Sequence, residues 1–282
     1  MSVAELPPTD LFGSPARSPV SRLCQSIALT LSSVDLDECL AAELEPTGAL
    51  SIHGRSIAMR EYPALDGRNS LGRVLLFGGI HGDEYSSVSI VFKWLPMLAE
   101  AKTRQFHWRV VPLLNPDGLL RRTSRRMNAN GVDLNRNFPA PDWLEATRDY
   151  WIRRTGRNPR RYPGPAPLSE PESRWLVEEI VRFEPDVIVA VHAPFSVLDF
   201  DGPSENPPQR LGPLRLRLLG TYPGSLGRYA GVHRQLPVVT IELPSAGTMP
   251  STEAQAAMWR DLVDWLAENL RETPDGSTIA AQ

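Results

Sequence analysis

The sequence predicts an α/β fold: a single domain with a central mixed, mostly parallel, twisted sheet flanked by helices. Short apolar runs rich in branched residues alternate with segments whose apolar residues recur every three or four positions. The expected strands are residues 73–77, 108–114, 186–191 and 237–241. The chain has 282 residues, 41% of them apolar, which is enough for one large core.

Composition and charge exclude several classes of protein. The formal net charge of −3 predicts no general attraction to nucleic acid or to an anionic membrane. The proline-rich N-terminus lacks the basic start and apolar core of a secretory signal, and no apolar run approaches the roughly 20 residues of a membrane helix. We therefore expect a soluble, cytoplasmic protein. Cys24 and Cys39 are too few for a disulfide framework or a cysteine zinc site.

The N-terminal region precedes the main domain and has no predicted role. Residues 1–20 are rich in proline and small polar residues, which predicts a flexible arm. Within residues 21–65, a weakly helical pattern interrupted by Asp35 is followed by short strands, of which Ser56–Tyr62 alternates as a half-buried strand should. We expect the main domain to span residues 66–272, followed by a disordered tail at 273–282.

The first expected strand of the main domain ends in the stretch Gly78–Glu84, around which the rest of the prediction is organised. Its three glycines allow a sharp turn and a close backbone approach. His81 and Glu84 stand three residues apart in it, just before a helical pattern over residues 85–101. An imidazole and a carboxylate are two of the three protein ligands that catalytic zinc usually takes.

The middle of the chain carries loops and one helix. The second strand, residues 108–114, runs into the turn Asn115–Gly118, and a basic segment then leads to the polar loop 131–139, which we expect at a cleft. Residues 139–168 have no clear period and predict a long loop. The helix after them is expected to begin with Ser169 as N-cap and Glu172 at the capping-box position.

Ionisable residues follow three of the expected strands: His81 with Glu84, then His192, then Glu242. The carboxyl ends of such strands lie at one edge of the sheet, where α/β proteins place their sites. Two imidazoles and a carboxylate leave zinc an open position for water, whose pKa the ion lowers to about 7. Glu242 fits the role of a carboxylate outside the metal shell that accepts the proton of this water. The last expected helix, residues 252–270, follows.

Each of these residues also has a simpler interpretation. His-x-x-Glu occurs in ordinary solvated turns, and His192 alone could be a hydrogen-bonded core residue. Glu242 could cap a helix or pair with an arginine. Arg125, Arg126 and Arg136 could form a solvated basic face. We favour a shared site because one cleft accounts for all of them.

Five motifs together resemble the funnelin-type zinc carboxypeptidases: His81–Glu84, Asn115–Gly118, Gly131–Phe138, His192 and Glu242. They occur in the order of that family across most of the chain, and the run Gly-Val-Asp-Leu-Asn-Arg-Asn-Phe is the most specific of them. The resemblance implies that the main domain is a catalytic domain of this type. It also implies one zinc ion per chain.

Within that family, the resemblance is greatest to bacterial members that cut the γ-D-glutamyl–diaminopimelate bond of murein peptides. The segments Pro165–Ser173, Pro223–Gly227 and Glu242–Pro244 carry this likeness. It implies a cytoplasmic enzyme of peptidoglycan recycling whose substrate is a small peptide such as a murein tripeptide. Nothing in the sequence indicates the oligomeric state.

The resemblance implies a role for each residue that matches a family motif. His81, Glu84 and His192 would bind zinc. Glu242 would act first as general base and then as general acid in the attack of a zinc-bound water. Asp133 matches an aspartate that orients the first histidine through a hydrogen bond.

Substrate-binding roles follow from the same resemblance. Asn135 and Arg136 match the pair that holds the terminal carboxylate of the substrate, for which arginine offers a fork of donors. Arg126 matches the arginine that stabilises the tetrahedral oxyanion. Arg125 is the alternative, because the basic run makes the alignment ambiguous by one residue. Tyr222 lies near the position of a mobile tyrosine in carboxypeptidases.

Four functions are compatible with these motifs. The leading hypothesis is a zinc-dependent amidase of murein peptides, and the alternative is an ordinary metallocarboxypeptidase of α-peptides. A deacylase of N-acyl amino acids shares the His-Gly-Asp-Glu start but not the two blocks that follow. A catalytically dead muropeptide-binding module would have lost a ligand or the base, and none is missing. Asp199, Asp201, Ser245 and residues 153–161 are candidates for reading the released amino acid, and the sequence does not choose among them.

Overall fold

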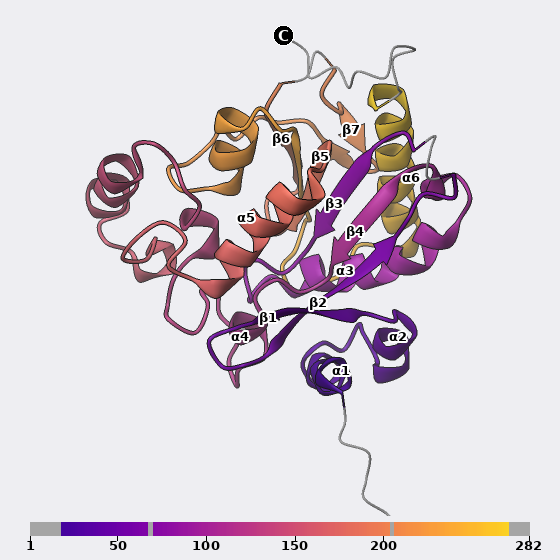
Figure 1. Cartoon of the computed structure of the whole chain (residues 1–282), viewed down its shortest axis with the longest axis horizontal. Coiled ribbons are helices and arrows are strands. Elements are labelled where there is room, and N and C mark those ends of the chain that lie inside the picture. The colour runs from indigo at the N-terminus through magenta and orange to yellow at the C-terminus, as the bar shows by residue number, and fades with distance from the viewer. Residues whose placement is uncertain (1–17, 67–69, 204–205, 271–282) are drawn as a thin grey trace, which may run out of the picture.

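The computed structural model describes residues 18–66, 70–203 and 206–270 (Figure 1). Most of the predicted arm and the whole predicted tail at 273–282 lie outside these residues. Within them, a seven-stranded sheet has the order β1-β2-β4-β3-β5-β9-β6. Its strands are β1 (Glu45–Leu50), β2 (Ser56–Tyr62), β3 (Arg73–Phe77), β4 (His107–Val111), β5 (Val187–His192), β6 (Val197–Asp201) and β9 (Val238–Glu242). The short strands β7 (Arg210–Leu211) and β8 (Leu214–Arg215) pair with each other.

The inner strands β4, β3, β5 and β9 run parallel, whereas β1 and β2 join one edge and β6 the other edge in antiparallel pairing. The predicted α/β fold with a mixed sheet is thus confirmed. Strand β6 was not predicted, because it lies within the turn-rich stretch after His192 and alternates apolar with acidic residues. One face of this edge strand adds Leu198 and Phe200 to the core and the other carries Asp199 and Asp201, so the strand lacks a continuous apolar run.

Helices cover both faces of the sheet (Figure 1). Two buried clusters of apolar side chains fill the layers between them. On one face, α3 (Tyr85–Trp94) and α6 (Thr252–Asn269) pack with the N-terminal helices against alternate residues of the strands. On the other face, α5 (Pro171–Phe183) and the π-helix η7 (Gly227–His233) cover the intervening residues. The sheet is therefore buried on both sides, and its strand ends remain available for a site.

The remaining helices are short. They are α4 (Pro116–Leu119), the 3₁₀ turns η1 (Leu95–Ala99), η2 (Thr103–Gln105), η3 (Leu134–Arg136) and η6 (Pro159–Arg161), and the π-helical turns η4 (Trp143–Thr147) and η5 (Tyr150–Arg154). None of the helices in the described ranges has the length and apolar character needed to span a bilayer.

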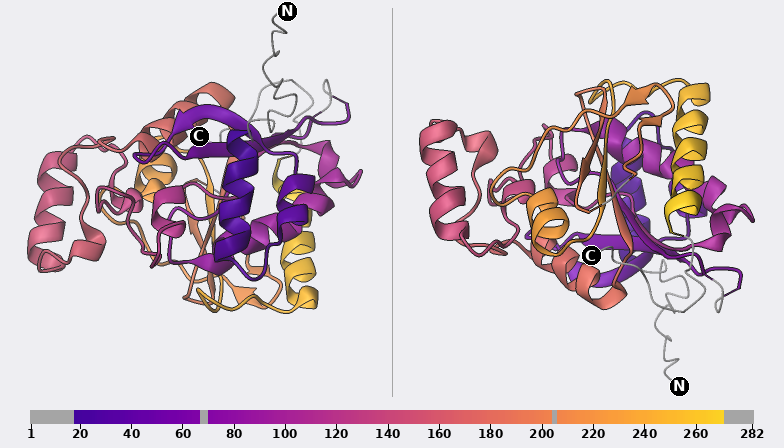
Figure 2. Two further views of the ribbon diagram at one scale, coloured as in Figure 1. Left: turned by 90° about the horizontal axis from the view of Figure 1, so that it is seen from below. Right: turned by 90° about the horizontal axis from the view of Figure 1, so that it is seen from above.

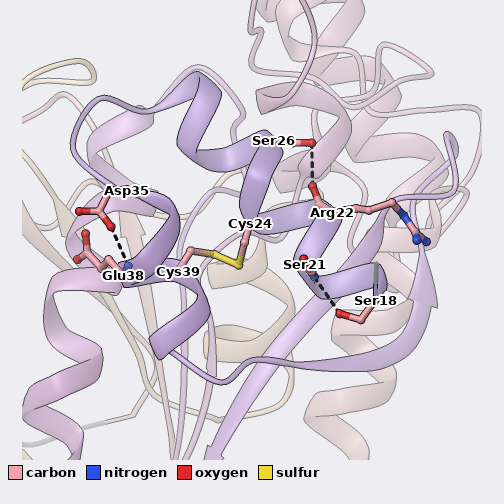
Figure 3. Close-up of a disulfide and its surroundings, with 8 residues drawn as sticks. All are labelled: Ser18, Ser21, Arg22, Cys24, Ser26, Asp35, Glu38 and Cys39. Carbon is pink, nitrogen blue, oxygen red and sulfur yellow. Dashed lines mark hydrogen bonds between the residues drawn. A yellow bond between two sulfur atoms is a disulfide. The ribbon is translucent and has the colours of Figure 1, made fainter. Parts of the chain in front are cut away.

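The N-terminal helices are α1 (Pro19–Thr30) and α2 (Leu36–Ala41), and a disulfide between Cys24 and Cys39 joins them (Figure 3). Both cysteines are fully buried. The interruption predicted at Asp35 is the start of α2, where the Asp35 side chain accepts a hydrogen bond of 2.8 Å from the backbone N–H of Glu38. The cysteine pair forms no framework, but it fastens two helices that pack on the main core.

The start of α5 differs from the prediction by one residue. The helix begins at Pro171, and Glu170 occupies the N-cap position without a side-chain capping bond. Ser169 instead donates to the Glu170 carboxylate at 2.7 Å. Glu172 is fully buried and accepts a hydrogen bond from Asn128 at 3.1 Å. The predicted capping box is therefore wrong, because these polar side chains bind the neighbouring loop and not the helix end.

Residues 139–168, predicted as a long loop, contain η4, η5 and η6. Figure 2 shows that the helical part of this segment projects from one side of the molecule, so we call residues 142–162 the lobe. The lobe is tied to the rest of the protein by an ion pair of 2.8 Å between Arg160 and Asp83.

Candidate active site

The turn after β3 is fixed by the turn after β4. Gly82 lies so close to Gly118 that a Cβ atom at position 82 would be 2.2 Å from the Gly118 carbonyl carbon. The Asn115 side-chain amide donates to the carbonyls of Ile80 at 3.1 Å and Arg126 at 3.2 Å. The Asn115–Gly118 motif thus holds the backbone that presents His81 and Glu84.

His81, Glu84 and His192 meet at the carboxyl ends of β3 and β5. The Nδ1 atom of His81 lies 2.8 Å from a Glu84 oxygen and 3.2 Å from Nδ1 of His192. His192 Nδ1 lies 3.2 Å from the other Glu84 oxygen. All three side chains are buried, and one ligand atom from each lies within 4.8 Å of the others. Two imidazole nitrogens and a carboxylate form a donor set suited to zinc, so the three residues could hold that ion.

The charges in this cluster favour a cation. Burial alone would raise the pKa of Glu84, but the two imidazoles hold it well below its usual range. Burial would likewise lower the pKa of His81, yet the carboxylates of Glu84 and Asp133 raise it. Glu84 is therefore ionised at neutral pH, and its negative charge would attract a metal ion held between it and the two histidines.

Asp133 connects the cluster to Arg126. One Asp133 oxygen lies 3.1 Å from Nε2 of His81, and the other accepts a hydrogen bond of 2.9 Å from Nε of Arg126. A guanidinium nitrogen of Arg126 also lies 3.6 Å from Glu84. Although burial alone would raise the pKa of Asp133, Arg126 and His81 hold it well below its usual range. The ionised Asp133 thus occupies Nε2 of His81 and leaves Nδ1 facing the other two ligands.

The structure separates the two neighbouring arginines that the sequence left open. Arg126 lines the cavity beside the cluster. Arg125 points elsewhere, because its guanidinium donates to the carbonyls of Asn128 and Ala129 at 2.9 Å each. Of these two arginines, Arg126 is therefore the one placed to contact a ligand in the cavity.

Glu242 lies next to the cluster but outside it. It ends β9 and is the direct cross-strand neighbour of His192 in the parallel pair of β5 and β9. The backbone N–H of Phe195 donates to one of its oxygens at 3.4 Å. Burial raises the pKa of Glu242 more than the nearby His192 lowers it. This carboxylate is thus disposed to hold a proton more readily than an exposed one.

A cavity of about 640 Å³ contains the cluster and opens beside the lobe. The three residues predicted to bind the substrate, Asn135, Arg136 and Tyr222, line this cavity. Arg136 is buried, its guanidinium lies 4.7 Å from the centre of the Tyr222 ring, and burial lowers its pKa to about 10. It still carries its charge at neutral pH. Asn135 accepts a hydrogen bond of 2.8 Å from the backbone N–H of Leu226, which orients its amide.

Two features of the cavity were missed by sequence reasoning. The first is the ion pair of Asp83 with Arg160, since nothing local in the sequence joins these positions. The second is strand β6 itself: Asp199 and Asp201 were candidates from the sequence, but the strand that brings both of them to the cavity was not predicted. The signal for β6 was present, because Leu198 and Phe200 alternate with the two aspartates, but the run is short and lies among turn-forming residues.

Comparison with known protein families identifies relatives of this chain. Residues 47–207 match the family described as zinc carboxypeptidase. Murein peptide amidase A of Escherichia coli strain K12 is 33% identical over 197 residues, a match covering 68% of this chain and 79% of that protein. Murein peptide amidase A of Vibrio campbellii is 31% identical over 228 residues, covering 77% of this chain and 86% of that protein.

Solved structures agree with this assignment. The crystal structure of murein-tripeptide amidase MpaA from Escherichia coli O157 aligns with a TM-score of 0.51 at 28% identity, covering 82% of this chain and 93% of that one. Carboxypeptidase A from Helicoverpa armigera aligns with a TM-score of 0.58 at 16% identity, covering 86% of this chain and 71% of that one. The second likeness concerns the fold alone.

Proposed function

Because this chain belongs to the zinc carboxypeptidase family, we propose that it is a zinc-dependent amidase that cuts the γ-D-glutamyl–diaminopimelate bond of murein peptides. Membership in the family makes the protein a peptide-bond hydrolase. The observation that carries the proposal is the meeting of His81, Glu84 and His192 beside Glu242 in one cavity. The choice of murein peptides is supported by relatives named murein peptide amidase A at 31% to 33% identity.

In the proposed mechanism, His81, Glu84 and His192 would hold one zinc ion, which would supply a water molecule acidic enough to give up a proton near neutral pH. Glu242 accepts the proton of the attacking water on a carboxylate oxygen and passes it to the nitrogen of the leaving amine. Its raised pKa suits both steps, because a carboxylate that holds a proton more readily is a better base and a usable acid near neutral pH.

Arg126 and Arg136 bind two different negatively charged groups of the substrate in this proposal. Arg126 stabilises the oxygen that becomes negative when the carbonyl is attacked, an effect worth about 3 kcal/mol in comparable sites. Arg136 and Asn135 hold the terminal carboxylate of the peptide, with the ring of Tyr222 over the guanidinium. In this proposal, the last peptide bond of a small substrate lies beside Glu242. Asp133 has a positioning role in this proposal, because it orients His81 and Arg126.

The proposed location is the cytoplasm. The buried disulfide of Cys24 and Cys39 provides the test, because a reducing compartment keeps such pairs as thiols. Alkylation under denaturing conditions, immediately after cell lysis, is expected to find both thiols free. An oxidised pair in the cell would place the protein in an oxidising compartment and reject a cytoplasmic location.

The proposed reaction is tested with two tripeptides that differ only in a γ or an α linkage, each offered with zinc and with a chelator. We expect zinc-dependent cleavage of the γ-linked peptide. Cleavage of the α-linked peptide alone would reject the murein assignment and favour an ordinary carboxypeptidase.

A variant pair tests Glu242 in the same assay. Glu242→Gln is expected to be inactive while still binding zinc by metal analysis. Glu178→Gln, an exposed carboxylate on α5, serves as the matched control and keeps full activity. If Glu242→Gln loses its metal as well, Glu242 is not the base proposed here.

A further inference from the structure

The cavity continues beyond the candidate reaction centre along one face of β9 and β6. In this antiparallel pair, Glu242 lies opposite Val197, Thr240 opposite Asp199 and Val238 opposite Asp201. All six residues line the cavity. With about 3.3 Å per residue along a strand, Asp199 lies about 7 Å and Asp201 about 13 Å from the level of Glu242. The cavity thus has a reaction end and an acidic end.

The acidic end is shaped by the backbone of η7. A Cβ atom at Gly227 would lie 2.0 Å from a carboxylate oxygen of Asp201, and a Cβ at Gly231 would lie 2.7 Å from its Cβ. Two glycines therefore make the room that the Asp201 side chain occupies. Gly227 follows Leu226, whose N–H is held by Asn135. The acidic end is thereby on the same wall as the proposed carboxylate clamp.

Among the described residues, no ion pair joins either aspartate to a cation. Asp199 is 5% exposed, and one of its oxygens accepts the backbone N–H groups of Phe200 and Leu219 at 2.9 Å each. In the described part of the chain, its second oxygen has no hydrogen-bond partner, and neither a hydrogen bond nor an ion pair reaches the Asp201 carboxylate. Burial and the neighbouring Asp199 raise the pKa of Asp201 to about 7. Asp199 is buried and Asp201 half-buried, and carboxylates shielded from water without a nearby cation are costly, so a ligand that supplies a positive charge is favoured.

We propose that Asp201 and Asp199 form a subsite for an ammonium group at the end of the side chain of the released residue. This inference rests on the proposed function and deepens it, because diaminopimelate carries an ammonium at its far end, on the carbon that also bears its second carboxylate. A long aliphatic chain spans the stretch lined by Thr240 and Val238, and the charge meets the carboxylates. A residue with an uncharged end leaves both carboxylates without compensation.

A purely structural role for Asp201 has less support. It accepts no hydrogen bond from the backbone of η7 among the described residues, so it does not cap that helix. Asp199, by contrast, holds the backbone at Leu219 with one oxygen and offers the other to the cavity. Asp201 is therefore the sharper test of the subsite, and Asp199 a secondary one.

The experiment uses zinc-loaded protein and three peptides with a γ-D-glutamyl linkage to diaminopimelate, lysine or norleucine. Lysine and norleucine differ at the side-chain end by the ammonium alone. We expect the wild type to prefer the first two peptides. Asp201→Asn should lower kcat/KM for these about 10- to 100-fold, the loss expected for one charged hydrogen bond, and leave the norleucine peptide nearly unchanged. Asp264→Asn, an exposed aspartate of α6, is the matched control.

Two results would overturn the subsite. One is equal turnover of the lysine and norleucine peptides by the wild type. The other is an equal loss on all three peptides in Asp201→Asn with zinc content and circular dichroism unchanged. If the γ-linked series is inert, the same comparison is made with α-linked peptides, since the side-chain preference is read within each linkage.

A binding measurement makes the test independent of turnover. By calorimetry, free lysine should bind zinc-loaded Glu242→Gln more tightly than norleucine does, and the added Asp201→Asn change should remove the difference. Equal affinities for the two amino acids would reject the subsite even if the proposed reaction is correct.

Discussion

The buried carboxylate of Glu172 should make the stability of the protein depend on pH. A hydrogen bond to Asn128 connects this carboxylate to the loop that carries candidate site residues. The carboxylate is fully buried near Asp117 and Glu170, and one of its oxygens has no partner. The other accepts from the Asn128 amide, whose own oxygen accepts the backbone N–H groups of Asn130 and Val132. This network supports the loop that leads from Arg126 to Asp133. Burial raises the pKa of Glu172 from 4.5 to about 7.

The magnitude follows from linkage between protonation and folding. A raised carboxyl pKa in the folded state favours folding below the unfolded value of 4.5, and this contribution is lost as the pH rises through about 7. Between pH 5 and pH 8 the loss amounts to about 2.5 kcal/mol. Glu172→Gln removes this titration while keeping an oxygen that can accept from Asn128. The variant should therefore gain about 2.5 kcal/mol relative to the wild type over that pH range.

The assay is urea unfolding of both proteins at pH 5, 6.5 and 8, with the difference in unfolding free energy taken at each pH. Metal binding affects both proteins alike, so it cancels in the difference. Glu178→Gln, an exposed carboxylate on the same helix, should show no such trend. A difference between wild type and Glu172→Gln that stays constant within about 0.5 kcal/mol would refute the reasoning.

Three further sets of substitutions test other parts of the structure. Arg126→Ala should lower kcat about 100- to 1,000-fold, whereas Arg125→Ala should change it little. Comparable losses of kcat for the two variants in steady-state assays would contradict the assignment of the oxyanion role to Arg126. Replacing Cys24 and Cys39 by alanine should lower the unfolding free energy by about 3 kcal/mol without changing zinc content, and an unchanged denaturation midpoint under oxidising conditions would contradict this. Gly82→Ala should weaken zinc binding by displacing the ligand turn, so retention of wild-type affinity in a competition titration would show that the turn can shift.

Much of the site was predictable because its residues end strands that read clearly as apolar runs. His81, His192 and Glu242 each follow such a run, and parallel strands bring their carboxyl ends to one edge. Their proximity needed only the fold class, without knowledge of side-chain packing. The same reasoning placed α6 close to its observed bounds, whereas the helix predicted over residues 85–101 is α3 only as far as Trp94 and continues as the 3₁₀ turn η1.

What could not be predicted depends on contacts between distant segments. The start of α5 lies one residue later than predicted. The Ser169 side chain bonds to Asn137 and the Glu172 side chain to Asn128, so neither caps the helix. The pairing of Cys24 with Cys39 depends on how α1 and α2 pack, which no local pattern encodes. Strand β6 presents two acidic residues to the cavity, so its sequence lacks the continuous apolar run that marks an inner strand.

The distribution of the site over β3, β5 and β9 bears on when the protein becomes active during synthesis. If the proposed roles hold, a nascent chain that has emerged only past β3 offers two ligands, and one that ends before β9 has no base. The polypeptide leaves the ribosome N-terminus first, and the strands that supply the last groups must still join the sheet. Peptide hydrolysis therefore starts only after most of the chain has been translated, so incomplete chains do not hydrolyse cellular peptides.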